Sequence, residues 1–180
     1  MKKLVYRLVT TVAVVGLIGP GLCAVEASAQ AQKPNPLDVV PDQMPFNVPY
    51  GMPISLEHAK SVIAAAAAEA TKRHWDMNIA VLDSGGNLVA FERMDGAQLA
   101  SISIAQHKAR VAVMYRRESK AFENGIQGGN NYLLTLDDVI GARGGIPLIE
   151  NGRLIGAIGC SGGTGSQDEV VAKAGAEAMK

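Results

Sequence analysis

Apolar residues recur at intervals of three and four over positions 56–72, which is the period of an amphipathic helix. Ser55 precedes this segment as a predicted N-cap, and Glu57 lies in the first turn, where the helix dipole favours a carboxylate. The pattern therefore predicts a first helix that ends near Lys72. Its alanine-rich face consists of Leu56, Ala59, Val62, Ile63, Ala66, Ala67 and Ala70.

Two later segments have the pattern of β-hairpins. Apolar residues at 78–82 and alternating residues at 87–93 flank the turn sequence Asp-Ser-Gly-Gly, and the segments 146–150 and 153–160 flank Asn-Gly, the signal of a type I′ turn. A second helix is predicted from Ser101 to about Glu118.

The remaining segments complete an α+β pattern. Residues 119–138 are rich in Gly and Asn without a sustained period, which predicts a long loop. The sequence Ser-Gln-Asp-Glu at 166–169 predicts a capping box in front of a third helix. The order helix, hairpin, helix, loop, hairpin, helix favours an antiparallel sheet flanked by helices, and hence the α+β class.

The first 29 residues have the features of a secretory signal peptide. A basic start precedes an apolar run at 8–18, and the small-residue site Ala-Ser-Ala ends at Ala29. Glycines and Pro20 interrupt the run too early for a membrane span. We therefore expect cleavage after Ala29 and a periplasmic or secreted protein. Lipidation of Cys23 is the alternative, although Leu22 stands where that signal requires a small residue.

Residues 30–53 form a proline-rich leader, because 30–54 contains six of the eight prolines in the chain. Such a segment is predicted to be extended, either as a tether or as a strap that packs on a neighbour. Residues 54–180 then form a single domain. After cleavage Cys160 would be the remaining cysteine, so no disulfide within one protomer is expected.

Charge and hydropathy exclude several classes of partner. The chain has 17 basic and 17 acidic side chains, and no basic cluster suggests nucleic-acid binding. No second apolar segment approaches membrane length, so stable membrane insertion is not expected. Whether the leader contacts a membrane sensor protein is left open by the sequence.

Six short sequence motifs, in the same order along the chain, resemble those of the GlcG/HbpS-like haem-binding family. This family also supplies the C-terminal domain of PduO-type cobalamin adenosyltransferases. The motifs lie at 54–59, 80–89, 91–97, 104–109, 144–147 and 155–163, followed by Asp168. The chain departs from the family pattern at Cys160, where a small aliphatic residue is usual. The resemblance implies a profilin-like, three-layer α/β/α fold with a five-stranded antiparallel sheet. It also implies a homo-oligomer that binds haem, or less often a corrinoid.

The candidate ligand contacts lie near the second helix. Lys108 falls in a stripe of small residues, where an ammonium needs a partner such as Asp95 or Glu92, and snorkelling to solvent is the alternative. The resemblance favours a role of Lys108 as the cation for a haem propionate. Arg93 is suited to the same role, and Asp95 would either fix the loop or line the site with Met94.

Iron ligation would fall to a histidine, with Met94 and Met114 as other candidates. We expect His107 first, because its face of the helix carries apolar neighbours, and His58 second, because it lies in the shared opening motif. His74 follows the first helix and suits a structural role.

Three functions fit these observations. The first is an exported haem-binding or tetrapyrrole-binding protein for sensing, storage or delivery. The second is an enzyme of haem degradation or of small oxidised carbon metabolites. The third is a structural oligomer with a vestigial pocket.

Overall fold

The computed structural model describes residues 38–179, so the predicted signal peptide and the first part of the leader lie outside the described residues. Residues from Asp42 onward form one compact unit. Its helices are α1 (Leu56–Lys72), α2 (Ser101–Met114), α3 (Lys120–Gln127) and α4 (Gly165–Glu177), with a 3₁₀ helix η2 (Asn131–Thr135). Within the described part of the chain, no helix is long and apolar enough to cross a membrane.

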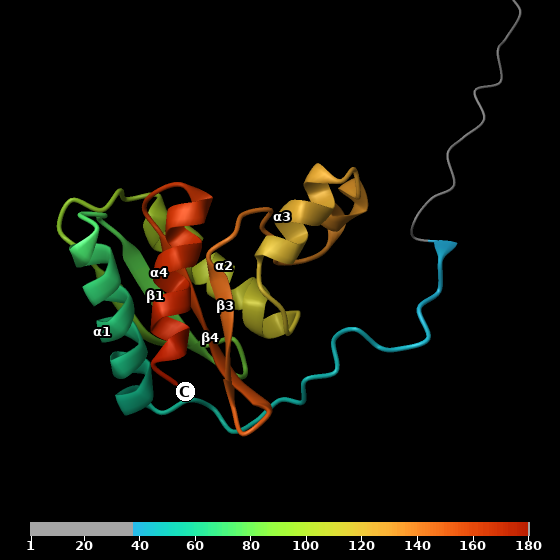
Figure 1. Ribbon diagram of the computed structural model, residues 1–180, viewed down its shortest axis with the longest axis horizontal. Helices are drawn as coiled ribbons and strands as arrows, with labels where there is room; N and C mark the ends of the chain where they lie inside the picture. The colour runs from blue at the N-terminus through green and yellow to red at the C-terminus, as the bar shows by residue number, and fades with distance from the viewer. Residues whose placement is uncertain (1–37, 180) are drawn as a thin grey trace, which may run out of the picture. The chain divides into compact units, whose positions relative to one another are not determined.

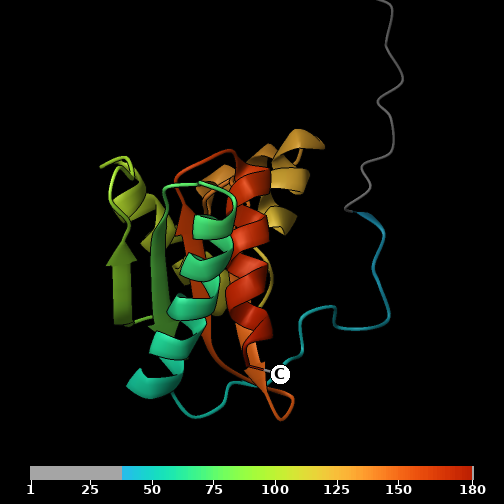
Figure 2. The ribbon, with the colours of Figure 1, turned by 60° about the vertical axis from the view of Figure 1, so that its left-hand side comes forward.

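The strands β1 (Asn78–Asp83), β2 (Leu88–Arg93), β3 (Gly145–Glu150) and β4 (Arg153–Ser161) form one antiparallel sheet in the order β2-β1-β4-β3. Helices α1 and α4 cover one face and α2 covers the other, which gives three layers (Figures 1 and 2). The α+β class is confirmed. Both hairpins are present, and Asn151 and Gly152 have the positive φ angles, 49° and 71°, of a type I′ turn.

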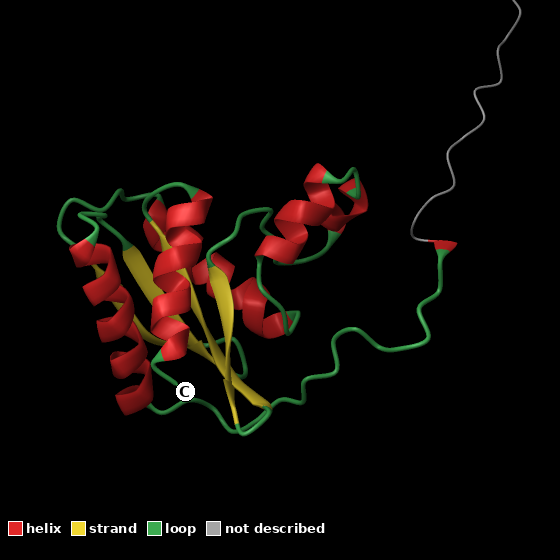
Figure 3. Ribbon diagram, in the orientation of Figure 1, coloured by secondary structure: helices red, strands yellow, loops and turns green. Residues whose placement is uncertain are grey.

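The fifth strand implied by the family resemblance is not present among the described residues, where the sheet has four. The last leader residues instead lie beside β4 where β1 has ended (Figure 3). Leu154 accepts from the Gly51 N–H at 2.8 Å and donates to the Pro49 carbonyl at 2.9 Å, which makes one parallel bridge at Tyr50. Pro49 and Pro53 lack N–H donors, so the pairing does not extend into a strand.

The expectation of a long loop at 119–138 is wrong. This segment contains α3 and η2, because Phe122 and Leu133 form a small apolar cluster with Val111 at the end of α2. Helix α2 also ends earlier than predicted, at Met114, and Arg116 adopts a positive φ of 55° that turns the chain.

The capping box of α4 lies two residues earlier than predicted. Thr164 is the N-cap: its hydroxyl accepts from the Gln167 N–H, and the Gln167 side chain accepts from the Thr164 N–H at 2.8 Å. Asp168 lies in the first turn of α4, and its side chain is buried.

Small residues let α2 approach the sheet closely. Ala105 and Ala109 pack on β4 at Gly159, where an added Cβ would lie 2.0 Å from the Ala105 carbonyl oxygen, so only glycine fits. This close approach carries Lys108, the neighbour of Ala109, against the end of the sheet.

Candidate functional site

Lys108 is buried at the end of the sheet and is 2 % exposed. Its ammonium donates to Asp168 Oδ2 at 2.6 Å and to the Cys160 carbonyl at 3.2 Å. The partner is therefore Asp168 of α4, and the expectation of Asp95 or Glu92 was wrong. Sequence spacing could not reveal this pair, because the two residues come from helices on opposite faces of the sheet.

Three hydrogen bonds to the Asp168 carboxylate offset its burial: Lys108 donates to Oδ2, and the Gly162 and Gly163 N–H groups both donate to Oδ1 at 3.0 Å. Burial raises the pKa of the Asp168 carboxyl, and the Lys108 ammonium opposes that rise. Because Asp168 already takes these two amides, the turn before α4 does not offer them to an external anion.

Arg93, Met94 and Asp95 follow one another at the end of β2. The side chains of Arg93 and Asp95 are exposed, and neither makes a hydrogen bond or ion pair within residues 38–179. Met94 is partly buried and packs against the apolar cluster beneath α1. The structure thus leaves Arg93 and Asp95 accessible, while Lys108 lies in the interior and is directed at Asp168.

His107 lies in a shallow surface depression of about 230 Å³ with Ser103, Gln106, Arg110 and Asp138. Its Nε2 is 2.8 Å from the Asp138 carbonyl oxygen, so this nitrogen carries the proton and donates. Val111, an apolar residue on the same face of α2, is buried in the core. The surroundings of His107 are polar, and its Nε2 is engaged.

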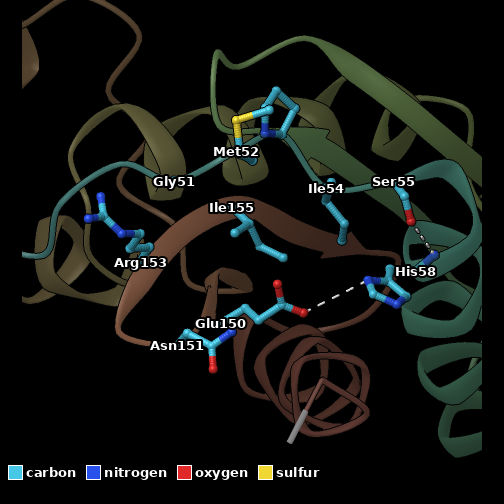
Figure 4. A pocket seen from close by; sticks show the side chains of 10 residues that line it. Gly51, Met52, Ile54, Ser55, His58, Glu150, Asn151, Arg153 and Ile155 are labelled. Carbon is cyan, nitrogen blue, oxygen red and sulfur yellow. Dashed lines mark hydrogen bonds and ion pairs between the residues drawn. The ribbon is translucent and has the colours of Figure 1, made fainter.

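His58 lies in the first turn of α1 and opens into a cavity of about 340 Å³ (Figure 4). Ser55 fixes this turn, because its hydroxyl accepts from the His58 N–H at 3.2 Å. The His58 side chain is 53 % exposed, and its Nδ1 lies 4.0 Å from Glu150 Oε1. The cavity is lined by Gly51, Met52, Pro53, Ile54, Ser55, His58, Glu150, Asn151, Arg153 and Ile155.

The end of the leader forms one wall of this cavity. Tyr50 anchors it by donating its hydroxyl hydrogen to the Met114 carbonyl at 2.9 Å, and the Arg116 guanidinium donates to the Val48 carbonyl at 3.3 Å. The Arg117 guanidinium stacks 3.4 Å from the centre of the Phe46 ring. We name residues 46–53 the leader strap. Phe46 and Tyr50 were not among the predicted site residues, although aromatic side chains between prolines favour packing of this segment on the domain.

Within one protomer, the predicted site residues His58 and Arg93–Asp95 do not lie close together. His58 lies at the start of α1, whereas Met94 donates its N–H to the Met77 carbonyl, beyond the other end of that helix. The part of α1 from His58 to Lys72 alone spans roughly 21 Å at a rise of about 1.5 Å per residue. His58 and the Arg93–Asp95 segment therefore belong to opposite ends of the domain.

Comparisons with known proteins agree with the fold. Residues 54–177 match the family model described as "Haem degrading protein HbpS-like". The chain is 41% identical over 108 residues to protein GlcG of Escherichia coli strain K12, which covers 60% of this chain and 81% of that protein.

Two solved structures are similar as well. The PduOC:Heme complex has a TM-score of 0.64 and 26% sequence identity, covering 71% of this chain and 95% of that one. A double mutant of Streptomyces reticuli HbpS has a TM-score of 0.67 and 26% identity, covering 79% and 98%. Since the family model covers well over half of the sequence, this chain belongs to the HbpS-like family.

Proposed function

We propose that the protein is an exported haem-binding protein that serves haem sensing, storage or delivery. Membership of the HbpS-like family and the similarity to a PduOC structure in complex with haem support this function. A corrinoid is the alternative tetrapyrrole. The signal-peptide pattern of residues 1–29 supports export, with a mature protein that begins at Gln30 in the periplasm or outside the cell.

The observation that supports placing haem here is the exposed imidazole of His58 in a cavity lined by both apolar and polar residues. Imidazole is the most usual protein ligand of haem iron. Met52 and Pro53 are exposed and offer apolar surface to a porphyrin, and Arg153 supplies a cation suited to a propionate. When bound, haem supplies an iron centre that takes up electrons and small diatomic ligands.

His58 therefore replaces His107 as the preferred iron ligand. Donation from His107 Nε2 to the Asp138 carbonyl would have to be lost before that nitrogen could bind iron. A propionate at Lys108 would have to displace Asp168 from a buried ion pair. Both steps cost free energy that binding at His58 avoids.

We propose in addition that the protein is a homo-oligomer. A cavity of about 340 Å³ would enclose only part of a macrocycle as large as haem, and a second copy would cover the rest. The exposed Arg93 and Asp95 are free to contact such a haem from a neighbouring copy. Light scattering at micromolar concentration should give a multiple of the protomer mass, and a monomer mass would contradict the proposal.

Absorbance titration of the mature protein with haemin tests the function. We expect saturable binding with a Soret band that differs from free haemin and persists under reductant and oxygen. Loss of the band under those conditions would support haem degradation, the enzymatic alternative. No saturable binding would refute the proposal and favour a structural oligomer.

A further inference from the structure

We propose that Glu150 is a positioning residue for His58: its carboxylate accepts a hydrogen bond from His58 Nδ1, which fixes the tautomer and strengthens His58 as an iron ligand. This inference rests on the proposed haem site at His58. It assigns to the site a carboxylate that does not itself touch the iron.

The geometry of the two residues is set by separate parts of the fold. Ser55 caps α1 and fixes the turn that carries His58, while Glu150 ends β3 next to the tight turn at Asn151. Figure 4 shows the Glu150 carboxylate directed across the cavity towards the imidazole, with Oε1 4.0 Å from Nδ1. Nδ1 and Nε2 point in different directions from the ring, so Nε2 is left for a ligand.

The distance of 4.0 Å is longer than a hydrogen bond, so the proposal requires one of the two side chains to rotate when haem binds. The side chains of His58 and Glu150 are 53% and 42% exposed, so rotation of either one meets little packing resistance. Contacts of this kind are often long in ligand-free proteins and tighten when the ligand binds.

Among residues 38–179, no lysine or arginine lies within ion-pair distance of Glu150. Arg153 is its cross-strand partner in the hairpin, yet the Arg153 guanidinium donates to the Tyr50 carbonyl of the leader strap at 3.4 Å. Within the described residues, His58 is the only basic side chain within ion-pair distance of Glu150. The carboxylate is thus available to the imidazole.

A carboxylate at Nδ1 changes the chemistry of His58. A neutral imidazole carries one N–H, and an anionic acceptor favours the tautomer that places it at Nδ1 and leaves the lone pair on Nε2. Carboxylates in this position orient histidine ligands and raise their basicity. A more basic ligand stabilises ferric over ferrous iron, so Glu150 should lower the reduction potential of bound haem.

The first test uses the protein without haem. Nitrogen-15 NMR of the His58 ring at alkaline pH should show the Nδ1–H tautomer enriched in the parent and depleted in Glu150→Leu, with an intermediate ratio in Glu150→Gln, which keeps an acceptor without charge. Glu57→Leu removes a carboxylate beside His58 in the sequence and is the matched control; it should leave the ratio unchanged. An equal ratio in the parent and Glu150→Leu would overturn the inference.

The second test uses the haem-loaded protein. Glu150→Leu should bind haem about tenfold more weakly and raise its reduction potential, whereas Glu57→Leu should change neither. An unchanged potential and affinity in Glu150→Leu would overturn the role of Glu150, even if His58→Ala abolishes the parent spectrum. An unchanged spectrum in His58→Ala would instead refute the proposed site itself, so the two failures are distinguishable.

Discussion

Lys108 Nζ lies 2.6 Å from Asp168 Oδ2, and both side chains are only 3% exposed. The pair joins α2, on one face of the sheet, to α4 on the other. Removing one partner of a buried ion pair costs about 3–5 kcal/mol, because the remaining charge stays buried without compensation. This contact therefore belongs to the stability of the fold.

We predict that Lys108→Met lowers the free energy of unfolding by about 3–5 kcal/mol and leaves the haem spectrum unchanged. Adding Asp168→Asn should recover part of the loss, because the amide oxygen still accepts from the Gly162 and Gly163 N–H groups. Urea unfolding and haemin titration of both variants measure this. A Lys108→Met protein as stable as the parent but deficient in haem binding would instead support the propionate contact expected from the sequence.

Acid should loosen the contact between α3 and the segment before β3. The hydrogen bond from Arg143 lowers the pKa of Glu123 below its ordinary value of 4.5. A carboxyl with a lowered pKa in the folded state contributes stability that is complete above 4.5 and is lost as the pH falls through the folded value. Unfolding free energy measured below pH 5 should therefore decline more steeply in the parent than in Glu123→Gln. Equal slopes would contradict this.

Cys160 should be inert in the folded protein. Its side chain is fully buried in β4, and burial raises the pKa of the Cys160 thiol, so little of the reactive thiolate forms. A chromogenic disulfide reagent should label the mature protein at the rate of global unfolding and label the urea-unfolded protein at once. Rapid labelling under native conditions would contradict the burial of this residue.

The leader strap should contribute measurably to stability. Tyr50→Phe removes the hydrogen bond to the Met114 carbonyl and should cost about 1 kcal/mol. It should also expose the strap to proteolysis, which mass spectrometry of the fragments detects. Tyr132→Phe, at an exposed position of η2, is the control and should behave like the parent. Equal stability of both variants would show that the strap is not anchored through Tyr50.

Local patterns predicted most of the secondary structure, because each carries its own signal. The stripe at 56–72 predicted α1, and Asn-Gly at 151–152 predicted the second hairpin. Helix α3 was missed because the glycines and asparagines at 124–131 indicated a loop although its eight residues are amphipathic, and its apolar cluster with Val111 and Leu133 is formed by tertiary contacts.

The candidate site was harder to predict, since it depends on which residues the fold brings together. The position of Lys108 among alanines correctly indicated burial, but its partner lies 60 residues away on another helix. The cavity at His58 combines the leader, the start of α1 and the β3–β4 turn. No spacing in the sequence connects these three segments.

The most direct test of the account compares the absorbance spectra of haem bound to the parent, His58→Ala and His107→Ala proteins. We predict that His58→Ala shifts the Soret band and changes the spin state, because an iron ligand is lost. His107→Ala should keep the parent spectrum, since His107 Nε2 is engaged by the Asp138 carbonyl. A parent spectrum in His58→Ala together with an altered one in His107→Ala would contradict the placement of haem at His58.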